Sequence, residues 1–164
     1  MKQVLIIRHA KSSWTNALVS DFERPLNDRG HRDAPLMAEK MKSRGVAIQA
    51  FLSSTANRAL TTAVYFAEAY GKAKKDILRF PKLYHAPAPV FYKVIETIPA
   101  AIETAAVFSH NPGITEFVNE LTETSIDDMP TCGIFAIRIE SDNWEDFRTA
   151  RKSFWFFDYP KIDR

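Results

Sequence analysis

Apolar residues follow two alternating patterns along the chain. Residues 4–7 form a continuous apolar run, which is typical of a strand covered by helices on both faces, and residues 51–53 and 105–109 predict further strands. Between these segments, apolar residues recur every three or four positions, the period of a helix with one buried face. Strands that alternate with helices in this way predict an α/β fold, a three-layer α/β/α sandwich with a mostly parallel central sheet.

Four helices are predicted from the helical period. For the second helix we expect Ser54 or Thr55 to cap the amino terminus, and for the fourth we expect Asn111, with Pro112 in the first helical position. Pro35 falls within the first helical pattern, where it either bends the helix or delays its start. The apolar positions that define the four patterns are Ala34, Met37, Ala38 and Met41; Ala59, Ala63, Phe66 and Tyr70; Phe91, Val94, Ile95 and Ile98; and Ile114, Phe117, Val118 and Leu121.

The C-terminal part of the chain changes character. Phe135, Ile137 and Ile139 alternate with small or charged residues, which predicts a strand with two different faces. Residues 149–157 predict its hairpin partner, and we expect both strands at an edge of the sheet. No repeat, low-complexity tract or flexible linker divides the chain, so we expect a single domain over residues 1–164.

The composition narrows the possible classes of function. Lys and Arg together number 22 and Asp and Glu 20 among 164 residues, a net charge of +2. This near balance disfavours a nucleic-acid or membrane-surface protein, and no apolar stretch is long enough for a signal peptide or a transmembrane helix. The one cysteine, Cys132, excludes an internal disulfide and a Cys-rich zinc site, and we expect it to be a small buried residue. A cytoplasmic location fits these features best.

Three predicted strands are each followed by arginine or histidine. Arg8 and His9 follow the first strand, Arg58 comes shortly after the second, and His110 follows a later one. Since the carboxyl ends of parallel strands meet at one edge of the sheet, where ligands bind in this class of fold, we expect these four side chains to lie together. Taken singly, each has an ordinary structural interpretation, as a capping or turn histidine or a surface ion-pair arginine. Their convergence favours a site.

These residue types predict phosphoryl transfer. Two guanidinium groups and the free N–H groups at a helix start bind a dianionic phosphoryl group. A histidine in such a pocket is a nucleophile when its imidazole is neutral, and nearby arginines favour the neutral form. A second, protonated histidine would stabilise the charge that develops on the equatorial oxygens, so the reaction would require no metal.

The sequence resembles the histidine phosphatase superfamily, and within it the short branch that acts on protein phosphohistidine. The resemblance extends from the first strand to about residue 140 and keeps the order and spacing of the family's motifs. It implies a phosphoglycerate mutase-like fold with neither metal nor cofactor. The segments that carry it are residues 5–12 (LIIRHAKS), 21–26 (DFERPL), 53–58 (SSTANR) and 110–113 (HNPG).

The resemblance also implies roles for individual residues. His9 would be transiently phosphorylated, and water would hydrolyse the intermediate. Lys11 and Ser12 would help to bind the substrate, although Lys11 also suits a solvated loop. An ion pair between Asp21 and Arg24 would fix their loop. The residues implied to form the catalytic phosphate pocket are Arg8, His9, Arg58 and His110.

The chain departs from larger members of the superfamily at one chemically important point. Those members use a Glu or Asp as general acid for an alcohol leaving group, whereas the corresponding residues 83–89 contain no carboxylate. Imidazole leaves far more readily than an alkoxide, so this absence favours phosphohistidine over a sugar phosphate. The expected partner is a phosphohistidine-bearing protein of the histidine phosphotransfer domain type. His85 is open to two interpretations, a substitute acid or a packed loop histidine.

Other interpretations remain open. The same pocket would serve a small-molecule phosphomonoesterase acting on a sugar phosphate or a nucleotide, with a general acid elsewhere in the chain. A non-catalytic phosphate-binding module would keep the pocket without turnover. A zinc hydrolase is disfavoured, because the sequence has no His-x-Glu or His-Glu-x-x-His spacing.

Overall fold

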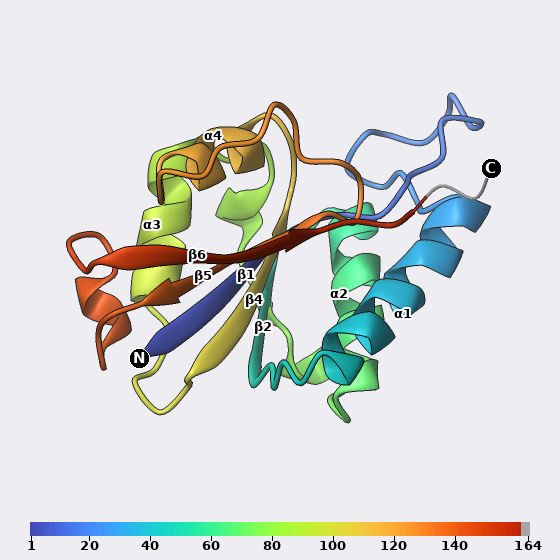
Figure 1. Ribbon diagram of the computed structural model, residues 1–164. Helices are drawn as coiled ribbons and strands as arrows, with labels where there is room; N and C mark the ends of the chain where they lie inside the picture. The colour runs from blue at the N-terminus through green and yellow to red at the C-terminus, as the bar shows by residue number, and fades with distance from the viewer. Residues whose placement is uncertain (162–164) are drawn as a thin grey trace.

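The computed structural model describes residues 1–161, which contain one six-stranded sheet with helices on both faces (Figure 1). The strands lie in the order β3-β2-β4-β1-β5-β6, with the first four parallel and β5 antiparallel to both β1 and β6. The predicted mostly parallel sheet and the C-terminal hairpin at its edge are therefore confirmed. The strands are β1 (Lys2–Arg8), β2 (Ala50–Ser53), β3 (Leu78–Arg79), β4 (Thr104–Ser109), β5 (Ile134–Ile139) and β6 (Lys152–Asp158).

The helices form the two outer layers of the predicted α/β/α sandwich. One pair covers one face of the sheet and the other pair covers the opposite face (Figure 1). Pro35 lies in the interior of the first helix and does not delay its start. Within residues 1–161, no helix is both long and apolar enough to cross a bilayer. The helices are α1 (Asp28–Ser43) and α2 (Asn57–Ala69) on one face and α3 (Ala88–Glu96) and α4 (Gly113–Asn119) on the other, with short 3-10 helices η1 (Lys74–Asp76), η2 (Pro81–Leu83) and η3 (Trp144–Asp146).

The central strand β1 explains why the first apolar run is continuous. Val4 and Ile6 belong to the core under α3 and α4, whereas Leu5 and Ile7 belong to the core under α1 and α2. All four side chains are 0% exposed, and each such burial stabilises the fold by about 2 kcal/mol. Because both faces of β1 are covered, the strand is rigid up to the residue where the site begins.

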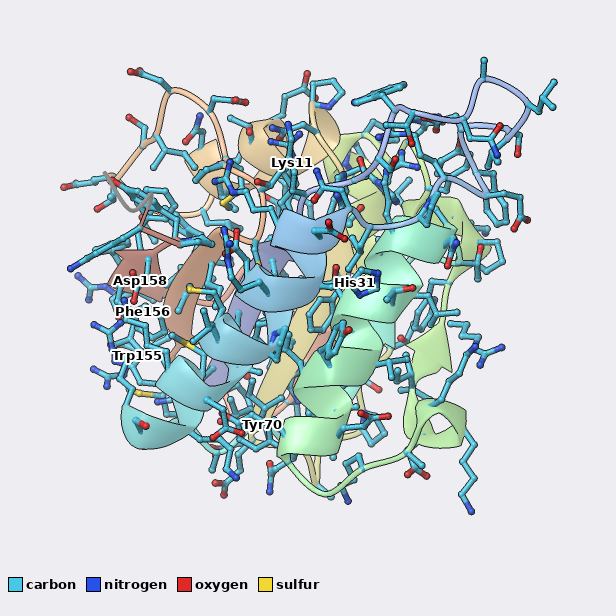
Figure 2. All side chains as sticks on the ribbon, turned by 90° about the vertical axis from the view of Figure 1, so that its right-hand side faces the viewer. Lys11, His31, Tyr70, Trp155, Phe156 and Asp158 are labelled. Atoms are coloured by element: carbon cyan, nitrogen blue, oxygen red, sulfur yellow. The ribbon has the colours of Figure 1, made fainter. Side chains whose placement is uncertain are left out.

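Charged and aromatic contacts join the C-terminal edge of the sheet to α1. Asp158, at the end of β6, lies 2.9 Å from Nζ of Lys40 and 3.4 Å from Nη1 of Arg44. The guanidinium of Arg44 lies 4.1 Å from the ring centroid of Phe156. Figure 2 shows Asp158 and Phe156 beside α1. These contacts hold the edge hairpin against the helical layer.

Two predicted helix caps are wrong, because the side chains bond elsewhere. The N-cap of α2 is Ala56, while the hydroxyl of Ser54 lies 2.8 Å from Nε2 of His110. The N-cap of α4 is Pro112, and the side chain of Asn111 bonds to the connection between α4 and β5. Neither side chain is the N-cap of its helix, and both form contacts in the neighbourhood of the predicted site.

Strand register brings the three predicted junctions to one edge of the sheet. Arg8, the last residue of β1, pairs with Ser109, the last residue of β4. Ser53, the last residue of β2, pairs with Phe108 of β4. The chain segments that follow β1, β2 and β4 therefore start side by side, as the parallel order predicted.

Candidate active site

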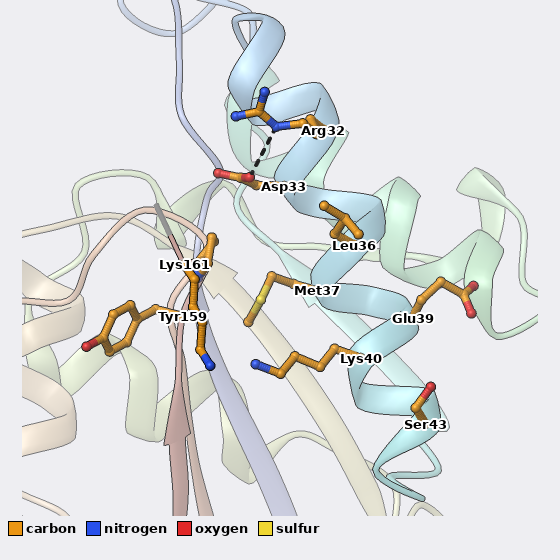
Figure 3. Close-up of a pocket in the computed structure, with 10 residues that line it drawn as sticks. Arg32, Asp33, Leu36, Met37, Glu39, Lys40, Ser43, Tyr159 and Lys161 are labelled. Carbon is orange, nitrogen blue, oxygen red and sulfur yellow. Dashed lines mark ion pairs between the residues drawn. The ribbon is translucent and has the colours of Figure 1, made fainter. Parts of the chain in front are cut away.

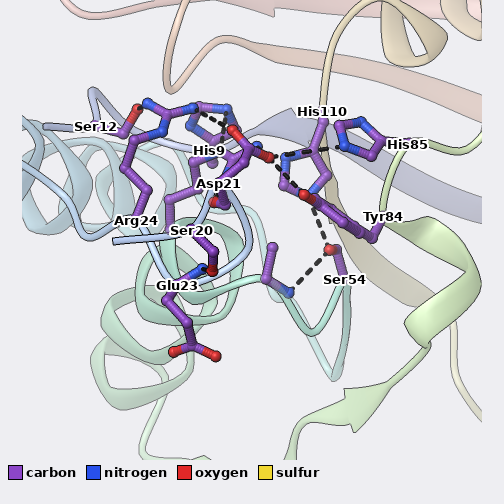
Figure 4. Close-up of polar contacts among 12 residues, drawn as sticks. His9, Ser12, Ser20, Asp21, Glu23, Arg24, Ser54, Tyr84, His85 and His110 are labelled. Atoms are coloured by element: carbon purple, nitrogen blue, oxygen red, sulfur yellow. Dashed lines mark hydrogen bonds and ion pairs between the residues drawn. The ribbon is translucent and has the colours of Figure 1, made fainter. Parts of the chain in front are cut away.

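A cavity of about 240 Å³ lies at this edge of the sheet. All six residues predicted to bind substrate or take part in catalysis line it. Tyr84 stands beside it, with its hydroxyl 2.5 Å from Asp21 (Figure 4). The lining residues are Arg8, His9, Lys11, Ser12, Trp14, Asp21, Arg24, Arg58, His85, His110, Asn111 and Thr131.

The geometry around His9 fixes which ring nitrogen is available. Its Nδ1 lies 2.7 Å from the carbonyl oxygen of Ala10, to which Nδ1–H donates. Nε2 is then left with its lone pair, and Nε of Arg58 donates to it at 3.4 Å. Burial above all, and the charges of Arg8 and Arg58 after it, lower the pKa of His9 to about 3. His9 is therefore neutral near pH 7, as nucleophilic attack requires.

His110 follows β4 and faces the ring of His9, with the two ring centroids 5.2 Å apart. Its Nε2 lies 2.8 Å from the hydroxyl oxygen of Ser54. Burial lowers the pKa of His110, and the neighbouring His9 and Arg58 act in the same direction. His110 is therefore neutral near pH 7, and the charge of a bound anion is needed before it takes up the proton predicted for it.

The pocket contains polar groups that lack partners. Among residues 1–161, the buried side-chain nitrogens without a hydrogen-bond partner are Nε of Arg8, Nε of Arg24 and Nδ1 of His110. All three residues line the cavity. Buried polar groups are nearly always satisfied in folded proteins, so unpaired nitrogens on three residues that line one cavity mark a place that is short of acceptor oxygens. An oxyanion fits this set of groups.

Asp21 joins several of these side chains. Its carboxylate lies 3.1 Å from Nη2 of Arg58 and 3.2 Å from Nη2 of Arg24, and accepts a hydrogen bond from the hydroxyl of Tyr84. The predicted Asp21–Arg24 ion pair is confirmed. The Tyr84 hydrogen bond above all, and the two arginines after it, lower the pKa of the Asp21 carboxyl. Asp21 is therefore ionised and holds both guanidinium groups, which the sequence did not reveal for Arg58.

The residues predicted to bind substrate differ in whether their side chains are free to contact a ligand. Lys11 lines the cavity. Ser12 is buried, and its hydroxyl accepts from Nη1 of Arg24, so Ser12 supports that arginine. His85 lines the cavity with an exposed ring, and its Nε2 is 3.7 Å from Asp21. Residues 83–89 bring no carboxylate, and the carboxylate beside them, Asp21, comes from a distant segment.

The donor set of the cavity suits an anion rather than a cation. Residues 1–161 contain no group of three or more His, Cys, Asp or Glu side chains arranged to hold a metal ion. The one carboxylate in the cavity is already bound to arginines. The predicted small buried cysteine, Cys132, is fully buried, and burial raises the pKa of its thiol, which disfavours the reactive thiolate.

A larger hollow of about 460 Å³ lies between α1 and residues 159–161 (Figure 3). Two carboxylates line it, Asp33 and Glu39, and Asp33 is paired with Arg29 at 3.2 Å and lies 3.9 Å from Arg32. No histidine or cysteine lines it. Because the paired histidines and the arginines with partner-free Nε atoms lie in the smaller cavity, we place the chemistry there.

Comparisons with known proteins agree with this geometry. Residues 4–81 match the sequence model of the histidine phosphatase superfamily (branch 1). An uncharacterized chloroplastic protein of Arabidopsis thaliana is 28% identical over 153 residues, which cover 88% of this chain and 70% of that protein.

Two solved structures share the fold. A protein assigned as the phosphohistidine phosphatase SixA from Agrobacterium tumefaciens has a TM-score of 0.81 at 23% identity, with 98% of this chain and 99% of that chain covered. The protein histidine phosphatase SixA complexed with tungstate has a TM-score of 0.80 at 22% identity, with 96% of each chain covered. The family match includes both His9 and Arg58, and the chain shares the phosphoglycerate mutase-like fold of these structures, so residues 4–81 are similar to the histidine phosphatase superfamily.

Proposed function

We propose that this protein removes the phosphoryl group from phosphohistidine on a partner protein, by way of a phosphorylated His9, with residues 1–164 acting as one domain. The observation that carries the proposal is the state of His9. Its unprotonated Nε2 faces a cavity in which buried nitrogens of Arg8, Arg24 and His110 lack partners. A nucleophile and an oxyanion site therefore meet in one place.

In the first step, the lone pair of Nε2 of His9 forms a bond to phosphorus while the P–N bond of the substrate breaks. The departing electron pair stays on the substrate's imidazole. Arg8, Arg58 and His110 stabilise the charge spread over the equatorial oxygens. The proton on Nδ1 of His9 stays on its hydrogen bond to Ala10, where it keeps the ring in the reactive tautomer.

In the second step, water adds to phosphorus and the bond to Nε2 breaks. The electron pair returns to Nε2, and phosphate leaves with both hydrogens of the water until it loses a proton to solvent. His9 returns to its starting tautomer. No metal or cofactor enters this balance, because the cationic side chains supply the electrostatic stabilisation.

The proton balance supports phosphohistidine as the substrate. Transfer between two imidazoles, each with a proton on its other nitrogen, exchanges equivalent bonds and needs no proton donor. An alkoxide leaving group gains a hundredfold or more, roughly, from a positioned acid. The carboxylate at the cavity, Asp21, is ionised and paired with Arg24 and Arg58, so it has no proton to give.

The SixA neighbours, whose names state activity on phosphohistidine, support the same substrate class. A histidine phosphotransfer domain would present such a side chain to an open cavity. We place the reaction in the cytoplasm, because a chain with one buried free cysteine and no disulfide suits a reducing compartment.

A substrate panel tests the proposal. A phosphohistidine-bearing protein should be turned over at least tenfold more efficiently, roughly, than sugar phosphates and nucleotides. His9→Ala should abolish both turnover and an acid-labile phosphoenzyme. His31→Ala is the matched control, because Nδ1 of His31 bonds to the hydroxyl of Tyr65 at 2.8 Å, between α1 and α2 and outside the cavity (Figure 2). Normal turnover by His9→Ala would refute the nucleophile, and preference for a sugar phosphate would refute the substrate class.

A further inference from the structure

The same pair of side chains, an asparagine and a threonine four residues later, occurs at the start of the helices that follow β2 and β4. Thr61 of α2 donates from its hydroxyl to Oδ1 of Asn57 at 3.1 Å. Thr115 of α4 donates to Oδ1 of Asn111 at 2.6 Å. A hydroxyl bound to the amide oxygen fixes which end of the asparagine carries the N–H groups. Both asparagines therefore have their donors aimed away from the helix.

The pair on α2 holds the segment that contains Asp21. Nδ2 of Asn57 donates to the carbonyl oxygen of Glu23 at 3.0 Å. The backbone N–H of Asn57 donates to the carbonyl oxygen of Phe22, also at 3.0 Å. In turn, Asp21 accepts from Arg58 twice, at its carbonyl oxygen from Nη1 (2.6 Å) and at its carboxylate from Nη2 (3.1 Å). The position of Arg58 thus depends on a segment that Asn57 fixes.

The pair on α4 holds the connection to β5. Nδ2 of Asn111 donates to the carbonyl oxygen of Met129 at 3.0 Å, and the backbone N–H of Met129 donates to the hydroxyl of Thr115 at 3.0 Å. The same Met129 carbonyl accepts from Nη1 of Arg8 at 2.8 Å. Residues 121–133 contain no helix or strand that would otherwise fix this carbonyl. The Asn111–Thr115 pair therefore holds both backbone polar groups of Met129.

We propose that Asn57–Thr61 and Asn111–Thr115 are positioning pairs, the first directing Arg58 and the second directing Arg8 toward the phosphoryl group. This inference rests on the phosphate-binding role proposed above for these arginines. Neither threonine lines the cavity, so each acts through the loop that its asparagine holds. A guanidinium binds an oxyanion well only when its planar donors are correctly oriented, which is the property the two pairs would control.

Tungstate binding tests the proposal without requiring turnover. Thr61→Val and Thr115→Val keep the shape of the side chain and remove the hydroxyl. Each should raise the dissociation constant of tungstate about fivefold, the range expected for one lost hydrogen bond. Thr61→Ser and Thr115→Ser should restore wild-type binding. Thr97→Val, which removes a hydroxyl bound to Val94 at the end of α3, should leave binding unchanged.

Crossed double variants separate positioning from general destabilisation. In an Arg8→Ala background Thr115→Val should have no further effect, and in an Asp21→Ala background Thr61→Val should have none. When the backgrounds are exchanged, so that Thr61→Val is combined with Arg8→Ala and Thr115→Val with Asp21→Ala, each threonine variant should still raise the dissociation constant of tungstate about fivefold. Equal effects in every background, or no effect of either single variant, would overturn the positioning role. Phosphorylation of His9 is measured separately, so these binding experiments can refute the positioning role of the two pairs without refuting His9 as the nucleophile.

Discussion

Nε of Arg58 lies 3.4 Å from Nε2 of His9, the unprotonated nitrogen of the proposed nucleophile. The other two nitrogens of the same guanidinium bond to Asp21. One side chain therefore connects His9, the proposed nucleophile, to the loop that borders the cavity. When a phosphoryl group enters, Arg58 is placed to exchange its contact with Nε2 for one with an oxygen, which frees the lone pair for attack.

Replacing Arg58 by lysine tests this connection. Arg58→Lys keeps the positive charge but cannot contact both Asp21 and a phosphoryl oxygen with a planar fork. We expect kcat/KM to fall by about 100- to 1000-fold, the effect of losing one oriented donor to a transition-state oxygen. Steady-state kinetics with a phosphohistidine substrate measure the loss. A variant within twofold of wild type, roughly, would mean that charge alone suffices.

The protonation state of His9 gives a spectroscopic prediction. Burial lowers its pKa to about 3, and Nδ1–H donates to Ala10 at 2.7 Å. Nitrogen NMR of the imidazoles should therefore show His9 neutral, with its proton on Nδ1, from pH 8 down to about pH 5. An ordinary histidine would be mostly protonated by then. Titration of the His9 signal near pH 6.5 would contradict the buried geometry.

The two buried histidines also make stability depend on pH. Their pKa values are lowered in the folded protein from an ordinary 6.5, so below about pH 6.5 the unfolded chain binds protons that the folded protein does not. Stability is therefore lost as the pH falls. Between pH 6.5 and 4.5 each histidine should lower the free energy of unfolding by about 2 kcal/mol.

Urea unfolding at the two pH values measures this loss. The lowered pKa of Asp21 also makes stability fall with falling pH, but mainly below the ordinary carboxyl pKa of 3.8. It therefore contributes little between pH 6.5 and 4.5. His9→Gln combined with His110→Gln should remove most of the pH dependence. An unchanged slope in that double variant would place its source elsewhere in the chain.

The sequence predicted those parts of the site that depend on local pattern. The apolar run before Arg8 and His9 marks a buried parallel strand, and the order of such strands places Arg58 and His110 at the same edge. These positions follow from backbone topology alone. The structure confirms the neighbourhood of all four residues.

The contacts that orient these side chains could not be predicted, because they join segments with no common period. Asp21 reaches Arg58 and Tyr84 from a loop whose path follows no helical or strand pattern. Ser54 and Asn111 carry strong capping signals, yet tertiary hydrogen bonds to His110 and Met129 prevail over local propensity. The four-residue spacing of Asn57 and Thr61, and of Asn111 and Thr115, was a visible local signal for such contacts.

Gly113 is predicted to be indispensable for the shape of the site. A Cβ atom there would meet the carbonyl oxygen of Ala86 at 1.7 Å. Gly113→Ala should therefore push α4 from the segment that carries Tyr84, lower the free energy of unfolding by about 1–3 kcal/mol and reduce turnover. Thermal unfolding and kinetics check both effects.

Gly45→Ala provides the matched comparison for Gly113→Ala. Gly45 has a φ of +84° but open space around it, so alanine there meets only backbone strain, about 1 kcal/mol. It lies after α1, away from the cavity, and turnover at a temperature where the variant is folded should be normal. Equal loss of activity in the two variants would show that the close approach of Gly113 does not shape the site.

The loop before Asp21 should distinguish a protein substrate from a small one. Leu18 is 96% exposed and Trp14 is 73% exposed, with the guanidinium of Arg24 stacked 3.5 Å from the Trp14 ring. Trp14 lines the cavity and Leu18 lies in the same loop, and exposed apolar side chains of this kind gain contacts only from a substrate large enough to cover them. Leu18→Ala should lower kcat/KM for a phosphohistidine-bearing protein about tenfold and leave a small phosphoramidate unaffected. Leu36→Ala, which truncates a 60% exposed leucine on α1 outside the cavity, should change neither. Equal losses of Leu18→Ala on both substrates would mean that the loop supports the cavity itself, and no loss on either would mean that the partner protein docks elsewhere.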